Sequence, residues 1–460
     1  MNRPDLEPTL RPSVSPPAVT PVEPPWLIYW QLTRFLLPLA LTAMVQEVNA
    51  QFVNGGMARI PQATETLASY GLAWGLTLFL ASILLQTKQL GLVLVDSRDA
   101  LRQVRRFVLL ASLLLAGLLG SLTFGPQSVW VIEQLHGIDA GLSRVVREAL
   151  VWFVPIPVIL GLTYFYSGLL IRIRRTDLVS LATLASVGAN ITAVVVLLPA
   201  GFIQAKPILL PILVTYAGVL TELGVNLWNY GRCFSPSLAE RGRPLTAGYI
   251  VRFYWPLALI MAIQGVSRPL INLFISHGPD AAQALAVLTV VYSLGRLPYS
   301  WLNEIRNLAP AFQDRAGSLP HIRRFTIGCA LVSLAIMVSL FWTPLRDTIL
   351  QTLIGLDGDL ARRAQAPLLI FTFFSLAVTF RAYGHSIGLL ERRTQAMAPS
   401  APARLIAIVL TLILLPHLGV HGAARGVAAL LCGFVFEALT VWLGVRRSNF
   451  AKLKSRMVEE

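Results

Sequence analysis

The stretch 252–276, RFYWPLALIMAIQGVSRPLINLFIS, is a long apolar run with a charge in its interior. Its 25 residues, at about 1.5 Å each in a helix, are enough to cross a hydrocarbon layer of about 30 Å. Gln264, Arg268 and Asn272 recur every four residues and are expected to share one face, and Pro269 is expected to kink the helix. An arginine facing lipid costs about 2.5–3.5 kcal/mol, so we expect Arg268 to face a protein-lined or watery cavity. The alternative is an internally paired arginine that joins two helices.

Part of this sequence pattern occurs twice in the chain, at an offset of 218 residues. The offset places Arg34, Phe35, Pro38, Leu39, Ala40, Leu41, Gln46 and Asn54 over Arg252, Phe253, Pro256, Leu257, Ala258, Leu259, Gln264 and Asn272. It also places Leu67 and Ala68 over Leu285 and Ala286 without a gap. One offset that serves two consecutive segments indicates a duplicated unit, so we predict two related halves.

The amino-acid composition is typical of a membrane protein. Of 460 residues, 55% are hydrophobic and only 13% charged, and the mean hydropathy is +0.65. The net charge of +15 is spread in short clusters between apolar runs, which favours a lipid bilayer over nucleic acid as the partner. Three isolated cysteines and six histidines without ligand spacing support neither a disulfide framework nor a metal site, and no cofactor is expected.

The apolar runs predict an all-α polytopic membrane protein with twelve transmembrane helices. They lie near 32–53, 66–95, 107–126, 148–171, 177–199, 207–231, 250–276, 280–303, 322–344, 364–390, 398–416 and 421–445. The expected organisation is a disordered Pro-rich tail (1–27), an N-terminal six-helix lobe (28–231), a linker (232–247), a C-terminal six-helix lobe (248–446) and a basic tail (447–460).

The loops predict the orientation. Arginine and lysine cluster after every second span, as in 98–106, 172–175, 232–243, 315–324, 392–393 and 446–456, and are sparse in the other loops. By the positive-inside rule, both termini are expected to be cytoplasmic, with the protein in the cell (inner) membrane. Because each half crosses six times, the repeats are expected to be parallel, forming two bundles around a central cleft.

Further polar and charged residues fall inside or at the ends of the predicted spans: Glu47, Gln51, Asn54, Lys88, Glu222, Arg296, Glu304, Arg306, Arg381, Arg404, Arg425 and Glu437. Basic groups outnumber acidic ones, and a cavity with surplus arginine suits a polyanion because guanidinium groups match phosphate and carboxylate oxygens. The alternative is that Glu304 pairs with Arg306 or Arg296 and that Arg404 snorkels to the interface. His385 either titrates or only packs.

Longer motifs resemble the progressive ankylosis protein family. They are LASYGLAW at 67–74, GLVLVDSR at 91–98, WPLALIMAIQGVSRPLINLFIS at 255–276, LPYSWLNEIRNLAPAF at 297–312, FWTP at 341–344, IGLDGD at 354–359 and LPHLGVHGAARGV at 415–427. The resemblance implies an exporter of inorganic pyrophosphate, with ATP or other nucleotides and citrate as related substrates. It also implies a fold similar to the multidrug and oligosaccharidyl-lipid exporters. The arginine-rich, lysine-poor composition and the short tail suggest a bacterial relative.

We therefore expect an exporter of small polyanions that works by alternating access. Lys88, Arg268, Asn272, Arg381, Arg404, Gln51 and Asn54 are expected to bind the substrate, and Glu47, Glu304, Arg306 and Glu437 to gate the site or balance its charge. A trianion leaving an inside-negative cell gains about 7 kcal/mol at 100 mV, so export needs no coupled ion; import would need one, with Glu47 or Glu437 as its site.

Two other function classes are weighed against export. A flippase for lipid-linked anions predicts an opening toward lipid and an apolar groove beside the basic cavity. An enzyme or scaffold would need carboxylates or histidines clustered at one depth, and the short loops leave little room for a catalytic domain, so the chain is not expected to be an enzyme.

Overall fold

The computed structural model describes residues 25–459 apart from 58, 135–139, 235–244, 279, 316 and 354–357, and its regular elements are helices. The prediction of an all-helical fold is confirmed. The first helix begins at Pro25, which suits a helix start because it has no N–H to leave unpaired. The Pro-rich tail up to residue 24 and most of the predicted linker lie outside the described residues.

The first half of the chain, called the N-half below, runs from α1 to η3. Its elements are α1 (Pro25–Met57), α2 (Ala63–Ala81), the 3-10 helix η1 (Ser82–Gln86), α3 (Thr87–Leu94), α4 (Arg98–Phe124), the π-helix η2 (Val129–Gln134), α5 (Ala140–Phe153), α6 (Ile156–Arg172), α7 (Thr176–Leu197), α8 (Gly201–Ala205), α9 (Leu209–Asn229) and the π-helix η3 (Tyr230–Phe234). Ser97 caps α4 by accepting a 3.2 Å hydrogen bond from the backbone N–H of Ala100. Between α5 and α6 the chain bends by 43°, at a break that contains Pro155.

The second half, called the C-half, runs from α10 to α19. Its elements are α10 (Ala247–Ser276), α11 (Ala281–Arg296), the 3-10 helix η5 (Ser300–Asn307), α12 (Leu308–Ala311), α13 (Ser318–Phe341), α14 (Leu345–Asp347), the π-helix η6 (Thr348–Leu353), α15 (Gly358–Phe371), α16 (Phe374–Leu390), α17 (Thr394–Met397), α18 (Ser400–Leu414), the 3-10 helix η7 (Leu415–Leu418) and α19 (Gly422–Glu459). The segment predicted as a basic tail from residue 447 continues α19, since Arg, Lys, Ala and Leu are good helix formers beyond the apolar run.

The sequence offset of 218 recurs in the helix bounds. Adding 218 to the bounds of α5 and α6 gives the bounds of α15 and α16. The backbone repeats as well, because Gln62 and Asp280 both have φ 54°, and Arg174 and Arg392 have φ 61° and 55°. Left-handed φ is uncommon for residues other than glycine. Its recurrence at equivalent positions supports the duplicated unit that the sequence predicts.

Ten helical segments of the described residues are long and apolar enough to cross a membrane, or eleven if α5 and α6 together make one bent span. The segment expected to cross near 280–303 is α11, which has 16 residues and covers about 24 Å, followed by η5. A helix of that length is shorter than the hydrocarbon layer. The chain is therefore a multi-pass membrane protein, and the count of twelve stays a prediction.

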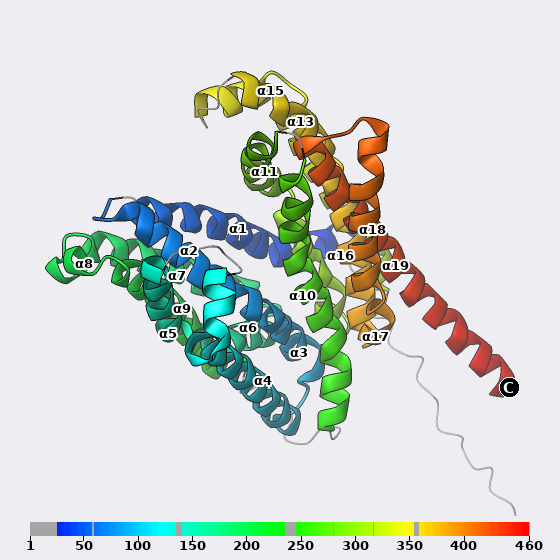
Figure 1. The fold of residues 1–460 in the computed structure, drawn as a ribbon. Helices are drawn as coiled ribbons and strands as arrows, with labels where there is room; N and C mark the ends of the chain where they lie inside the picture. The colour runs from blue at the N-terminus through cyan, green and yellow to red at the C-terminus, as the bar shows by residue number, and fades with distance from the viewer. Residues whose placement is uncertain are drawn as a thin grey trace, which may run out of the picture.

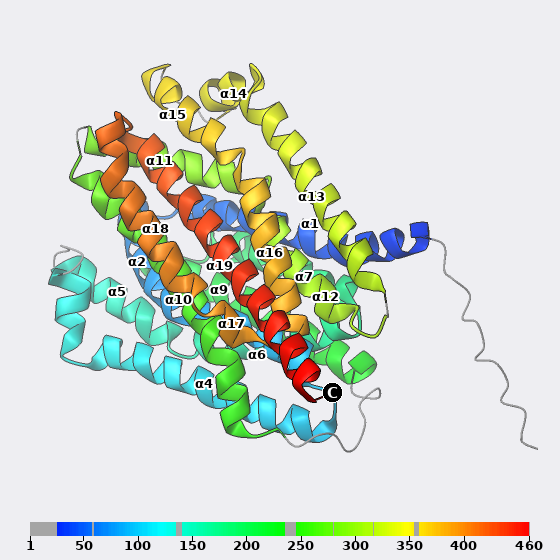
Figure 2. The ribbon, with the colours of Figure 1, turned by 90° about the vertical axis from the view of Figure 1, so that its right-hand side faces the viewer.

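The two halves form separate groups of helices that meet at one end. In Figure 1, α2 and α8 of the N-half lie far from α15 of the C-half, and α3 and α16 lie where the groups meet. Figure 2 again shows α2 and α5 apart from α13 and α15. Contacts between the halves link α1 with η5, α10 with η1, and α12 with α3 and α6. The groups therefore diverge from a shared base.

Aromatic side chains of the two halves pack against each other at this base. Phe35 of α1 packs edge-to-face on Phe312 at 5.5 Å between ring centroids, and Phe107 of α4 does so on Tyr254 of α10 at 5.3 Å. The Tyr254 hydroxyl also donates a 2.8 Å hydrogen bond to the carbonyl oxygen of Ile83. These residues join one buried apolar core that spans both halves.

Candidate functional site

A cavity of about 460 Å³ lies between the halves and is lined mainly by the C-half. The N-half contributes α1 and η1, and the C-half contributes α10, the end of α11, η5, α16, α18 and α19. The lining residues are Ala43, Gln46, Leu85, Gln86, Leu257, Ile260, Met261, Gln264, Gly265, Arg268, Arg296, Tyr299, Ser300, Asn303, Glu304, Arg306, Arg381, Ala382, His385, Leu389, Arg404, Leu430 and Phe434. We call this cavity the chamber.

The chamber is strongly cationic. Five arginines line it, from five different elements or element ends: Arg268, Arg296, Arg306, Arg381 and Arg404. Among the lining residues that the structure describes, Glu304 is the one carboxylate. Among the described residues, the five guanidinium groups outnumber the two carboxylates beside them, Glu304 and Glu437, which suits an anion with several charged oxygens.

Glu437 lies fully buried behind the chamber wall and holds two of the arginines. Its Oε2 accepts from Arg404 Nη1 at 2.6 Å and from Arg381 Nη1 at 3.3 Å. Its Oε1 accepts from Gln264 Nε2 at 2.9 Å. One carboxylate shared by two guanidinium groups gives a cluster with one net positive charge. Glu437 therefore orients Arg381 and Arg404 without neutralising both.

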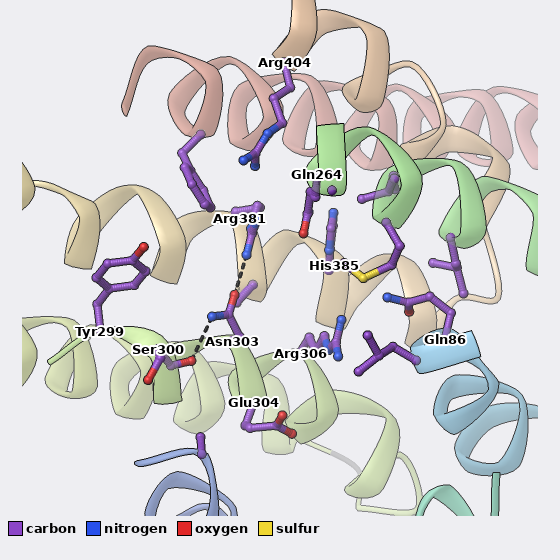
Figure 3. A pocket seen from close by; sticks show the side chains of 18 of the residues that line it. Gln86, Gln264, Tyr299, Ser300, Asn303, Glu304, Arg306, Arg381, His385 and Arg404 are labelled. Atoms are coloured by element: carbon purple, nitrogen blue, oxygen red, sulfur yellow. Dashed lines mark hydrogen bonds between the residues drawn. The ribbon is translucent and has the colours of Figure 1, made fainter. Parts of the chain in front are cut away.

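The ring of Phe434, one helical turn before Glu437, supports the same two arginines. The guanidinium carbons of Arg381 and Arg404 lie 4.6 Å and 4.2 Å from its centroid. Arg381 also donates to the side-chain oxygen of Asn303, as Figure 3 shows. Cation–π contact and hydrogen bonding fix both guanidinium groups at the wall of the chamber.

Several buried side-chain nitrogens at the chamber have no partner. Among the described residues, Arg306 Nε, Arg381 Nε and His385 Nε2 are buried and make no hydrogen bond. Figure 3 shows the side chains of Arg306 and His385 approaching each other across the pocket. Buried polar groups are almost always paired, so the two unpaired arginine N–H groups on the lining of one chamber indicate that an acceptor group belongs there.

At the base of the chamber, the halves are joined by a polar cluster. Lys88 Nζ and Glu304 Oε2 form an ion pair at 2.8 Å, and Asn307 Nδ2 donates to the same oxygen at 2.6 Å. Gln89 Nε2 donates to Asn307 Oδ1 at 3.0 Å. Lys88 and Gln89 come from α3, and Glu304 and Asn307 from η5, so the cluster ties the two halves together. We call these four residues the base cluster.

Of the residues predicted from the sequence to bind substrate, the structure brings Arg268, Arg381 and Arg404 to the chamber. Arg268 stacks on the ring of Tyr292 at 4.8 Å, and no carboxylate of the described residues pairs with it. Arg404 does not snorkel to the interface, since it is buried against Glu437. Lys88 does not line the chamber, since it is held by Glu304.

Asn272 is exposed and lies away from the chamber. A helix turns by about 100° per residue, so each step of four adds about 40°, and Asn272 has rotated about 80° from Gln264. The side chains of Glu47, Gln51 and Asn54 lie outside the described residues, although their backbone belongs to α1.

The gating and charge-balancing residues fall in two places. Glu304 and Arg306 line the chamber, but Glu304 pairs with Lys88 rather than with Arg306 or Arg296. Glu437 lies behind the wall. Four further lining residues were not predicted from the sequence: Gln86, Asn303, Tyr299 and Phe434. The offset of 218 is a signal for one of them, because it places Gln86 over Glu304.

Solved structures of similar shape are transporters of the MOP superfamily. A MOP superfamily transporter from Pyrococcus furiosus, described as having a binding pocket of reverse polarity, is 12% identical over 92% of this chain and 96% of its own, with a TM-score of 0.67. The eukaryotic MATE transporter AtDTX14 is 12% identical over 92% and 98%, with a TM-score of 0.70. A MATE structure in a bent conformation is 15% identical over 94% and 98%, with a TM-score of 0.69.

These likenesses define the class: the chain is a multi-pass membrane protein with the fold of MOP superfamily transporters. Its family is shown by a match to the Progressive ankylosis protein (ANKH) over residues 23–343. The chain belongs to the progressive ankylosis protein family. The resemblance expected from the motifs, and the multidrug-exporter type of fold, are confirmed.

Proposed function

We propose that this membrane transporter exports small polyanions through the chamber by alternating access, with inorganic pyrophosphate, ATP or other nucleotides, and citrate as the candidate substrates. The observation that supports this most directly is that five arginines line one cavity, and that the described part of its lining contains a single carboxylate. Pyrophosphate, nucleotides and citrate each carry several anionic oxygens that forked guanidinium donors bind well.

The described conformation is, in this proposal, the outward-facing one. Arg174, in a basic loop, donates to the carbonyl oxygen of Ala311 across the base at 2.9 Å, and its guanidinium carbon lies 4.4 Å from the Phe312 ring centroid. Basic loops mark the cytoplasmic side. The halves therefore meet on the cytoplasmic side and diverge on the other, which leaves the chamber accessible from outside.

The electrostatics support export. A trianion that leaves an inside-negative cell gains about 7 kcal/mol at 100 mV, so an empty cationic chamber that rocks between the two sides moves anions outward. In the inward-facing state the base cluster opens and Glu304 releases Lys88. The chamber is then open to an anion from the cytoplasm.

The test is efflux from liposomes that contain the purified protein and are loaded with labelled pyrophosphate, ATP or citrate, under an imposed inside-negative potential. Arg268→Ala is expected to lower the efflux of the transported anion by about 10-fold, since it removes roughly 1.4 kcal/mol of binding. Arg102→Ala is the matched control, because Arg102 is an exposed arginine that pairs with Asp99 on α4.

Arg268→Lys and a thermal-unfolding curve guard against misfolding of the variant. Equal efflux from Arg268→Ala and the wild type would remove Arg268 from the site. Protein-dependent movement of a lipid-linked anion, with no efflux of any free anion, would replace the exporter by the flippase.

A further inference from the structure

Exposed arginines lie beside the contact between α4 of the N-half and α10 of the C-half at the base. Phe107 packs on Tyr254 there, and Arg105 and Arg106 directly precede Phe107 in α4. In α10, Arg252 precedes Tyr254 by two residues and is exposed. Figure 1 and Figure 2 both show the first turns of α4 and α10 close together. We call this contact, with its three arginines, the first seam.

The duplication builds a second seam, between α13 of the C-half and α1 of the N-half. Its arginines are the counterparts, at the offset of 218, of those at the first seam: Arg323 and Arg324 of α13, and Arg34 of α1. Tyr29 of α1 packs edge-to-face on His321 of α13 there, with 5.7 Å between the ring centroids. Each seam therefore combines two arginines of one half with one arginine of the other.

The positive charge of both seams is unbalanced. All six arginines are exposed, and none of them forms an ion pair with a described residue. Helices α10 and α13 contain no Asp or Glu, and the one carboxylate of α4, Asp99, pairs with Arg102. Glu47 of α1 lies about 20 Å along the helix from Arg34. Each seam thus presents three positive charges to whatever surrounds it.

The surroundings of the seams are lipid. Exposed apolar residues follow the paired arginines in the next turns of α4 and of α13, and they too are counterparts at the offset of 218: Leu109, Leu113 and Leu114, and Ile327, Leu331 and Val332. Exposed apolar side chains of a membrane-spanning helix contact acyl chains. The arginines that immediately precede them therefore lie at the level of the lipid headgroups.

Trp255 of α10 adds an interfacial side chain to the first seam. It is exposed, and it lies two residues before Leu257, which lines the chamber. Two residues turn a helix by about 200°, so Trp255 points away from the chamber, to the lipid side of α10. Tryptophan is enriched at headgroup level because its ring is apolar and its N–H is polar. Its counterpart in α1, Leu37, is also exposed.

We propose that each seam binds the headgroup of one anionic phospholipid, with the phosphate held between arginines of the two halves. Guanidinium groups bind phosphate oxygens through forked hydrogen bonds, and basic sites between membrane helices suit phosphorylated headgroups. The acyl chains then lie along the exposed leucines of α4 at the first seam and along their counterparts on α13 at the second. The proposal does not depend on which anion the chamber carries.

A phospholipid bound at a seam bridges the two halves. Its phosphate contacts arginines of α4 and α10, or of α13 and α1, which lie together because the halves meet there. A ligand that contacts both halves binds this arrangement more tightly than one in which they separate, and so stabilises the closed base. Arginines from both helices of a seam are therefore expected to contribute to the lipid affinity.

The test counts bound lipids by native mass spectrometry on the purified, delipidated protein. The wild type is expected to retain one molecule of added phosphatidylglycerol at each seam, and to retain phosphatidylcholine at neither. Two triple variants are each expected to lose one of these lipids, and their combination to lose both: Arg105→Gln, Arg106→Gln and Arg252→Gln at the first seam, and Arg323→Gln, Arg324→Gln and Arg34→Gln at the second. Glutamine forms helices nearly as well as arginine, so the thermal-unfolding curves of these variants are expected to match that of the wild type.

Bridging and charge are tested with further variants. Arg252→Gln alone and Arg106→Gln alone are each expected to lower the affinity of the first seam about 5-fold, since each removes an arginine of a different half. Lysine at all six positions keeps the charge and is expected to keep both lipids. The matched control removes three exposed arginines that lie outside both seams, Arg144→Gln, Arg175→Gln and Arg362→Gln, and is expected to bind like the wild type.

Several results would overturn the proposal. Equal retention of the two lipids would mean that the seams do not recognise a net negative charge. Unchanged retention in the combined variant, or an equal loss in the control, would place the lipid elsewhere. Displacement of phosphatidylglycerol by glycerol 3-phosphate at the same concentration would assign the seams to a free phosphate. An effect of Arg106→Gln without one of Arg252→Gln would confine the site to one half.

Discussion

Gln89 donates a hydrogen bond of 3.0 Å to Asn307, and the two residues are 218 positions apart. Because 218 is also the offset that aligns the two halves in sequence, each residue contacts its own counterpart. Contact between counterparts places the pair on the axis that relates the two copies. The ion pair of Lys88 with Glu304 lies directly beside it, so the base of the chamber is built around the symmetry axis of the fold.

The first prediction concerns this ion pair. Lys88→Glu and Glu304→Lys each place like charges at the base and are expected to lower anion efflux by about 10-fold or more, because the base no longer closes. The double variant restores an attractive pair with its charges exchanged. It is expected to recover efflux to within about 3-fold of the wild type, as a double-mutant cycle with strong coupling would show.

The double variant with exchanged charges distinguishes two possible roles of Lys88, as part of a gate or as a substrate-binding residue. If Lys88 contacts the substrate directly, moving its charge to position 304 does not restore the lost contact. Thermal unfolding checks that the double variant is folded. If it is folded but no more active than the less active single variant, Lys88 binds the substrate and the ion pair is not a gate.

The second prediction concerns Asn272 and Gln264, which the sequence placed on one face. Asn272→Ala is expected to leave efflux within about 2-fold of the wild type, since Asn272 is exposed away from the chamber. Gln264→Ala removes the donor to Glu437 Oε1 and is expected to lower efflux by several fold. Loss of efflux in Asn272→Ala, with normal efflux in Gln264→Ala, would contradict the assignment.

Asn272 and Gln264 show which features of the site could be predicted from the sequence. The halves and most spans were predictable, because a membrane helix must be a long apolar run and because duplicated segments keep recognisable sequence similarity. That Arg268 belongs to a polar interior was predictable as well, because lipid excludes an arginine. A spacing of four residues, however, only approximates a helical face, and the drift over two steps removes Asn272.

Partners across the fold were not predictable in the same way. The pairing of Lys88 with Glu304, and of Glu437 with both Arg381 and Arg404, depends on how helices distant in sequence meet. Hydropathy gives no information on that register. The 3-10 helix η1, which directly precedes α3 and its base-cluster residues, also leaves no break in the apolar run near 66–95.

The third prediction tests the close packing of α3 on α6. A Cβ at Gly168 would lie 2.1 Å from the carbonyl oxygen of Lys88, which is backbone and cannot rotate away. Gly168→Ala is therefore expected to destabilise the protein by about 1–3 kcal/mol, measured by thermal unfolding in detergent. Gly188→Ala in α7 is the matched control. A Cβ there meets nothing within 4 Å, and the substitution is expected to be neutral or slightly stabilising.

The last prediction concerns Glu437, whose removal leaves Arg381 and Arg404 buried without their shared counterion. Glu437→Gln keeps the shape but not the charge, and it is expected to cost about 3–5 kcal/mol of stability. An anion in the chamber would replace part of the missing charge, so millimolar pyrophosphate is expected to raise the unfolding temperature of Glu437→Gln more than that of the wild type. Chloride at equal ionic strength is the control. An equal shift for both proteins would mean that the anion does not bind beside these two arginines.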